Sequence, residues 1–165
     1  MNNKMTTRYV LILYLLFASN LAFSQQTLNF VTLDDFAPFT WKEGGQAKGI
    51  DIEIVRELCF RLNVRCNITF LPWKRALARV ESGSSDGAFS AFKTPERMAY
   101  SHFLDYPIHL STYKIFVRKG REFPFTGYKD LYGKKFGKNL GFNTGEEFDT
   151  AVVKGRIHIE EANTA

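Results

Sequence analysis

The chain alternates between runs with a two-residue hydrophobic period and runs with a helical period. Residues 27–33 alternate apolar and polar side chains, as a half-buried strand does. After a loop and the turn at Gly44 and Gly45, Asp51 is the predicted N-cap of a helix that ends near Asn63. The apolar residues of that helix follow the spacing of one face: Ile54, Val55, Leu58, Cys59 and Leu62.

The same alternation continues through the first two thirds of the chain. Residues 65–70 predict a second strand, residues 73–81 a second helix, and residues 86–90 a short third strand. A further helix is predicted to start with Thr94 as its N-cap and Pro95 as its first residue. This β-α-β-α-β order predicts an α/β domain with a largely parallel sheet.

The pattern changes near Tyr106 and Pro107 and becomes less regular. The peptide Thr144-Gly145-Glu146-Glu147 has the form of a capping box and predicts a helix that reaches about Val153. Three more strands are predicted in this part, at residues 112–118, 134–140 and 157–159.

The first 24 residues have the organisation of a signal peptide. Lys4 and Arg8 precede the unbroken apolar run 9–17, and the small residues Ala22 and Ser24 follow at the spacing that a signal peptidase recognises. We expect cleavage after Ser24 and export. The alternative is a membrane anchor, but the run is shorter than the roughly 20 residues that span a bilayer.

Composition and charge narrow the class of protein. Hydrophobic residues make up 45% of the chain and charged residues 24%, which is typical of a folded protein and excludes disorder. The net charge of +5 includes no long basic run, so we expect no nucleic-acid partner. His102, His109 and His158 lack the spacing of metal ligands, and we expect no cofactor or metal.

Cys59 and Cys66 both follow the predicted cleavage site. An oxidising compartment permits a disulfide between them, and the alternative is a pair of buried free thiols.

Seven short motifs, taken in order, resemble the bacterial extracellular solute-binding proteins of family 3, periplasmic receptors for polar amino acids. The resemblance covers residues 28–165. The motifs are Phe36-Ala37-Pro38-Phe39, Gly49-Ile50-Asp51-Ile52, Leu71-Pro72-Trp73, Asp86-Gly87-Ala88, Thr94-Pro95-Glu96-Arg97, residues 103–107 and Asp130-Leu131-Tyr132-Gly133-Lys134-Lys135.

The resemblance implies a two-lobed α/β fold, the type II periplasmic-binding-protein fold, with the ligand enclosed between the lobes. Residues 1–24 are then the signal peptide, residues 25–109 most of lobe one, and residues 110–165 the start of an incomplete lobe two. Cys59 and Cys66 also resemble a disulfide found in some members of the family.

Arg97 is the foremost candidate site residue. A helix start favours an anion, and a guanidinium can hold a carboxylate through two parallel hydrogen bonds. In the family, the matching arginine binds the ligand α-carboxylate. The alternative is an ion pair with Glu96 or a surface acid.

The resemblance also implies other ligand contacts. Phe36 matches a ring that stacks on the ligand and Trp73 a second wall, although both are also suited to plain core packing. Ser90 offers a hydroxyl in a segment, residues 86–97, that is one residue shorter than the usual pattern. Thr144 lies in a peptide that resembles the loop closing over the ligand, or it serves only to cap a helix.

The resemblance implies a periplasmic, non-enzymatic protein. Its partners would be a small polar ligand, with a carboxylate, and the permease of an ABC-type transporter. One alternative is an enzyme on the same scaffold, similar to the periplasmic cyclohexadienyl dehydratases, with Lys93 as the candidate acid or base. Another is a truncated fragment without a function of its own.

Overall fold

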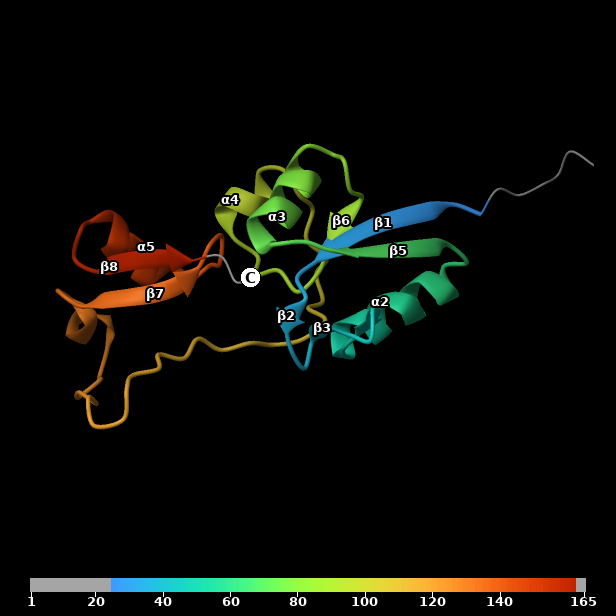
Figure 1. Cartoon of the computed structure of the whole chain (residues 1–165). Helices are drawn as coiled ribbons and strands as arrows, with labels where there is room; N and C mark the ends of the chain where they lie inside the picture. Colours follow the sequence, from blue (N-terminus) through green and yellow to red (C-terminus); the bar gives the residue numbers. More distant parts are fainter. Residues whose placement is uncertain (1–24, 163–165) are drawn as a thin grey trace, which may run out of the picture.

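A three-stranded parallel sheet organises the first part of the molecule (Figure 1). The computed structural model describes residues 25–162, so the predicted signal peptide lies outside the described residues. The central strand is β1 (Thr27–Thr32), with β5 (Arg65–Phe70) on one side and β6 (Gly87–Ala88) on the other. The three predicted strands are thus confirmed, although the third is limited to two residues.

Helices cover both faces of this sheet. Successive residues of a strand point to opposite faces, and in β1 Val31 packs with Trp73 and Ala76 of helix α3 (Trp73–Glu81), whereas Phe30 packs against helix α2 (Ile50–Arg61) on the other face. In Figure 1, α3 and α2 accordingly lie above and below the strands. The predicted α/β architecture is confirmed for this N-terminal unit, by which we mean residues 25–98.

The N-cap of α2 is Gly49 and not Asp51, so that prediction was wrong. Three short antiparallel strands, β2 (Asp35–Phe36), β3 (Thr40–Glu43) and β4 (Gln46–Lys48), fold the chain back on itself. As a result, Pro38 and Phe39 lie beside the first turn of α2. The backbone carbonyls of Pro38 and Phe39 then accept from the first amides of α2, at 3.0 and 3.1 Å. Asp51 therefore does not cap the helix, and its side chain is fully buried in the first turn.

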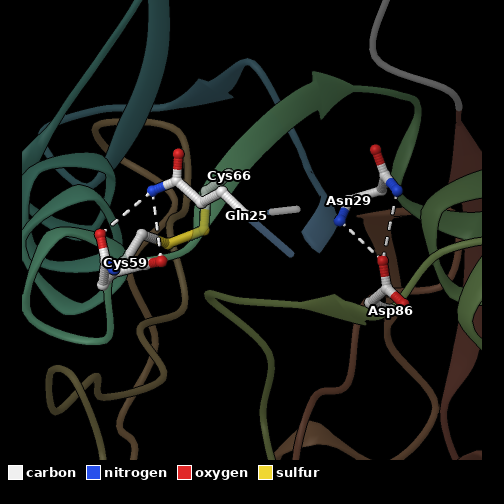
Figure 2. Close-up of a disulfide and its surroundings, with 6 residues drawn as sticks. Gln25, Asn29, Cys59, Cys66 and Asp86 are labelled. Atoms are coloured by element: carbon white, nitrogen blue, oxygen red, sulfur yellow. Dashed lines mark hydrogen bonds between the residues drawn. A yellow bond between two sulfur atoms is a disulfide. The ribbon is translucent and has the colours of Figure 1, made fainter. Parts of the chain in front are cut away.

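A disulfide joins the end of α2 to the start of β5 (Figure 2). Asn63 reverses the chain with a positive φ of 53°, and the Cα atoms of Cys59 and Cys66 lie 6.1 Å apart. The Gln25 side chain donates to the Asn63 backbone carbonyl at 3.2 Å. The structure thus contains the predicted pair.

We expect the double variant Cys59→Ser/Cys66→Ser to lose about 2.5 kcal/mol of unfolding free energy, because the crosslink restricts a short loop of the unfolded chain. Urea titration of the oxidised wild-type protein and the variant measures this loss. Reduction of the wild-type protein by dithiothreitol is the control and should reproduce it. A variant as stable as the oxidised wild type would show that the crosslink contributes nothing.

A smaller C-terminal unit, residues 128–162, has its own hydrophobic cluster. Strands β7 (Lys135–Asn139) and β8 (His158–Ala162) pair in parallel, and the 3-10 turn η1 (Tyr128–Leu131) precedes them. Helix α5 (Glu146–Val153) connects the two strands. The cluster consists of Leu131, Phe148, Ala151 and Ile157. The predicted helix and two of the three predicted strands are confirmed.

The predicted capping box of α5 was wrong. Its N-cap is Gly145, which has no side chain to accept a hydrogen bond, and the Thr144 hydroxyl bonds to the Asp149 carboxylate instead. Thr144 thus lies one residue before the N-cap, and Gly145 has a positive φ of 93°. No described helix is long and apolar enough to cross a membrane.

Residues 101–127 form an extended connecting segment between the two units (Figure 1). The strand predicted at residues 112–118 is not formed, because a strand requires a hydrogen-bonded neighbour and no described strand pairs with this segment. Several of its large apolar side chains are exposed: Leu104, Tyr106, Leu110 and Phe116.

Candidate functional site

Arg97 lies in the short helix α4 (Pro95–Met98), at the helix start predicted from the sequence. The Thr94 hydroxyl accepts from the Arg97 backbone amide at 3.3 Å, which is the expected N-cap contact. The guanidinium is buried, and the residue is only 6% exposed. Its Nη1 donates to the Phe92 carbonyl at 2.8 Å and its Nη2 to the Gly141 carbonyl at 3.0 Å.

The electrostatic environment of Arg97 is unusual for a buried cation. Within residues 25–162 no carboxylate lies within ion-pair distance of it, so the alternative pairing with Glu96 is not formed. Burial lowers the pKa of the Arg97 guanidinium, and the nearby Tyr100 and Glu96 oppose that shift in part. A buried cation held by neutral carbonyls is a favourable place for an anion, since an anion would compensate its desolvation.

Trp73 contacts Arg97 and also lines a cavity. The Cζ atom of Arg97 lies 5.6 Å from the centre of the Trp73 ring, within the range of a cation–π contact. Trp73 also lines a cavity of about 120 Å³, which lies between the N-terminal unit and residues 139–142. It is lined by Leu33, Asp34, Asp35, Phe70, Leu71, Pro72, Trp73, Asn139, Leu140 and Phe142.

This cavity is small for a ligand site, since pockets for small ligands commonly measure roughly 300–1,000 Å³. Three of its walls are aromatic, and Asp34, Asp35 and Asn139 supply polar groups. This combination suits a small molecule with flat or apolar parts and a few polar atoms.

Phe36 lies next to this cavity and does not line it. The ring is partly buried against the hydrophobic cluster that contains Val31, Leu33 and Trp73, and it lies 5.2 Å from the ring of Phe39. In the present structure Phe36 therefore has the packing role that was its alternative interpretation. Trp73 combines both roles, since it belongs to the core cluster and lines the cavity.

Ser90 is committed to a buried polar network. Its hydroxyl donates to the Asp51 carboxylate at 2.6 Å, and its backbone has a φ of 63°, which is uncommon for a residue with a side chain. Asp51 also shares a hydrogen bond with Nδ1 of His109 at 2.9 Å. The His109 ring stacks on Phe39, with the ring centres 3.8 Å apart.

Asp51 and His109 were missed as a pair by sequence reasoning. They are 58 residues apart, and the sequence interpreted each separately: Asp51 as a helix cap and His109 as a histidine without metal-ligand spacing. A buried carboxylate requires compensating partners, and Ser90 and His109 provide them. The network ties the start of α2 to the beginning of the connecting segment.

Thr144 does not reach Arg97. It lies in a second polar network, in which the Asp149 carboxylate accepts from the Asn143 amide at 3.1 Å and from the Thr144 hydroxyl. The residue that does contact Arg97 is Gly141, three positions earlier. Sequence reasoning did not single out Gly141 or Phe142, because nothing local marks a glycine carbonyl as a partner for a distant arginine.

The structure locates the group that the enzyme alternative depends on. Lys93, the candidate acid or base of the enzyme alternative, is exposed. Among the described residues there is no group of three or more side chains suited to a metal ion. The described residues offer a buried cation in contact with Trp73, and a cavity that is lined by the same tryptophan and by polar groups.

A family model for bacterial extracellular solute-binding proteins, family 3, matches residues 28–164. The L-cystine-binding protein TcyJ of Escherichia coli (strain K12) is 26% identical over 112 residues, or 67% of this chain and 42% of that protein. The arginine-binding extracellular protein ArtP of Bacillus subtilis (strain 168) is 27% identical over 111 residues, or 67% and 42%.

Solved structures agree with this match. The ancestral amino acid-binding protein AncCDT-1, a precursor of cyclohexadienyl dehydratase, superposes with a TM-score of 0.66 and 26% identity. The match covers 82% of this chain and 61% of that protein. The chain thus spans less than two thirds of these relatives and has part of the type II periplasmic-binding-protein fold. Since the family model covers nearly all of its described residues, the chain belongs to the bacterial extracellular solute-binding proteins, family 3.

Proposed function

We propose that this protein is an exported solute-binding protein that captures a small, carboxylate-bearing ligand between two lobes and presents it to an ABC-type transporter in the periplasm. The observation that carries the proposal is Arg97, a buried guanidinium without a carboxylate partner within the described residues. A ligand carboxylate would supply the missing negative charge through two charge-assisted hydrogen bonds.

The lobe assignment is part of the proposal. Residues 25–109 would form most of lobe one, and residues 110–165 would begin lobe two. The cavity lies where residues 139–142 approach the N-terminal unit, as expected for a ligand site shared between lobes. Hinge closure around a ligand is a common motion of such proteins, and the connecting segment is placed to allow it.

The cavity lining narrows the proposed ligand class to amino acids and similar molecules. Trp73 and Phe142 can pack against an apolar or flat portion, while Asp34 and Asp35 can accept from an ammonium or guanidinium group. Relatives named for arginine and L-cystine binding support this class. No observation favours the enzyme alternative over binding, so we propose no reaction.

Calorimetric titration of the protein, expressed from its whole gene, tests the proposal. The probes are L-arginine, L-cystine and L-glutamine, with agmatine as the matched control, because agmatine is L-arginine without its carboxylate. We expect at least one amino acid to bind. If that is L-arginine, agmatine should bind at least about tenfold more weakly, since each lost charged hydrogen bond is worth about 1.5–3 kcal/mol.

Two results would contradict the proposal. Agmatine binding as tightly as L-arginine would show that Arg97 does not hold a carboxylate. Turnover of prephenate or arogenate by the purified protein would instead support the enzyme alternative.

A further inference from the structure

The position proposed for a ligand carboxylate is taken by the chain itself. Nη2 of Arg97 donates to the backbone carbonyl of Gly141 at 3.0 Å, across a separation of 44 residues. Nη1 is held separately by the carbonyl of Phe92, five residues before Arg97. One of the two contacts is therefore local, and the other joins the N-terminal and C-terminal units.

The packing of Phe142 and the position of Gly141 against α3 hold this carbonyl in place. Phe142 packs against the cluster that contains Val31, Leu33 and Trp73. Gly141 itself lies against the start of α3, so close that a Cβ atom built on it would be 3.4 Å from the Cα atom of Lys74. Its φ of 80° is a conformation that L-residues rarely adopt.

A second contact secures the same loop from the connecting segment. The Tyr113 hydroxyl donates to the Asn143 side-chain oxygen, and the Tyr113 ring stacks on Phe92 with the ring centres 5.0 Å apart. Phe92 thus holds Arg97 through its carbonyl and Tyr113 through its ring. Residues 141–143 are therefore held by hydrogen bonds from two residues, Arg97 and Tyr113.

We propose that the Gly141 carbonyl is an intramolecular competitor for the anionic group of the ligand at Arg97, an autoinhibitory contact that ligand binding must break. The inference rests on the proposed function for its ligand, although the contact itself does not. A carboxylate carries a full negative charge and can accept two parallel hydrogen bonds from a guanidinium, whereas the Gly141 carbonyl is neutral and accepts one, so a carboxylate can displace Gly141. Only molecules in which the contact is open can bind the ligand. The apparent association constant is therefore the intrinsic constant multiplied by the fraction of open molecules.

Arginine-specific labelling with phenylglyoxal tests the contact without a ligand. Mass spectrometry of the peptide containing Arg97 gives its labelling rate, and exposed Arg79 in the same protein is the internal reference. Gly141→Ala disfavours the positive φ and should raise Arg97 labelling about five- to thirtyfold. Gly120→Ala is the matched control, since Gly120 has a φ of 81° in an open position, and it should leave Arg97 labelling unchanged.

A milder variant guards against a folding defect in Gly141→Ala. Tyr113→Phe removes the hydroxyl that holds Asn143 and keeps the ring on Phe92, so it should also raise Arg97 labelling while thermal unfolding remains near that of the wild type. Equal Arg97 labelling in the wild type, Gly141→Ala and Tyr113→Phe would overturn the proposal.

Titration of L-arginine into the same variants separates the two proposals. If both hold, Gly141→Ala binds L-arginine more tightly than the wild type, and L-arginine protects Arg97 from labelling in each. If labelling rises but none of L-arginine, L-cystine and L-glutamine binds or protects, the contact stands and the proposed ligand class fails. If L-arginine binds the wild type and both loop variants with the same affinity, the Gly141 carbonyl is not a competitor.

Discussion

Arg97→Ala is expected to lower the affinity for a carboxylate-bearing amino acid at least tenfold. The substitution removes a guanidinium that can form two charge-assisted hydrogen bonds, each worth about 1.5–3 kcal/mol. Arg97→Lys should restore only part of the affinity, because an ammonium group cannot present two parallel donors. Calorimetry on the three proteins, with the amino acid that binds the wild type, gives the comparison.

The structure adds a requirement to this experiment. Arg97 also holds the carbonyls of Phe92 and Gly141 and covers Trp73, so its loss affects folding as well as binding. Thermal unfolding of each variant must show that the protein remains folded at the titration temperature. Arg79→Ala is the matched control, since Arg79 is exposed on α3. Wild-type affinity in a folded Arg97→Ala protein would show that Arg97 does not bind the ligand.

The elements that could be predicted from the sequence are those whose limits are set locally. Helix α3 has the predicted bounds. Pro72 separates it from the preceding strand, and Gly83, with a φ of 70°, terminates it. Strands β1 and β5 could be predicted because their apolar and polar residues alternate, which is a local pattern. The helix start before Arg97 was predictable for the same reason, as Thr94 and Pro95 define it.

The incorrect predictions involve contacts between distant residues. Asp51 has the sequence position of a cap, but the capping acceptors come from Pro38 and Phe39 after the chain folds back. Residues 112–118 have the composition of a strand, yet strand formation depends on a neighbour that no local pattern reveals. A local pattern therefore predicts an element well where the contacts that define it are within a few residues.

The candidate site divides in the same way. Arg97 and Trp73 were predicted as site residues through the family resemblance, and the structure places them in contact. Ser90 and Thr144 were predicted as ligand contacts, but in this structure their hydroxyls are bonded to Asp51 and Asp149. A sequence shows that a hydroxyl is available, whereas its partner depends on which buried carboxylate the fold brings near.

The largest effect on stability is expected for Gly49→Ala, at the start of α2. Gly49 has a φ of 133° and a ψ of 161°, a backbone region that only glycine occupies readily. A Cβ atom at this position would overlap the carbonyl group of Phe39 and lie 2.9 Å from the Thr40 nitrogen. These are backbone atoms, and Phe39 is held by hydrogen bonds to Phe36 and Asp51, so they cannot move aside as the end of a side chain can.

The overlap and the strained backbone together should cost roughly 3–5 kcal/mol of unfolding free energy. Relief of the overlap would break the hydrogen bonds from Ile50 and Asp51 to Pro38 and Phe39, and with them the start of the helix that carries Asp51. Gly44→Ala is the matched control: Gly44 also has a positive φ, 57°, but no atom lies within 4 Å of the added carbon, so we expect a loss of only about 1 kcal/mol. Urea unfolding of the two variants and the wild type measures the two losses of unfolding free energy. Equal losses would show that the start of α2 rearranges to accept a side chain at position 49.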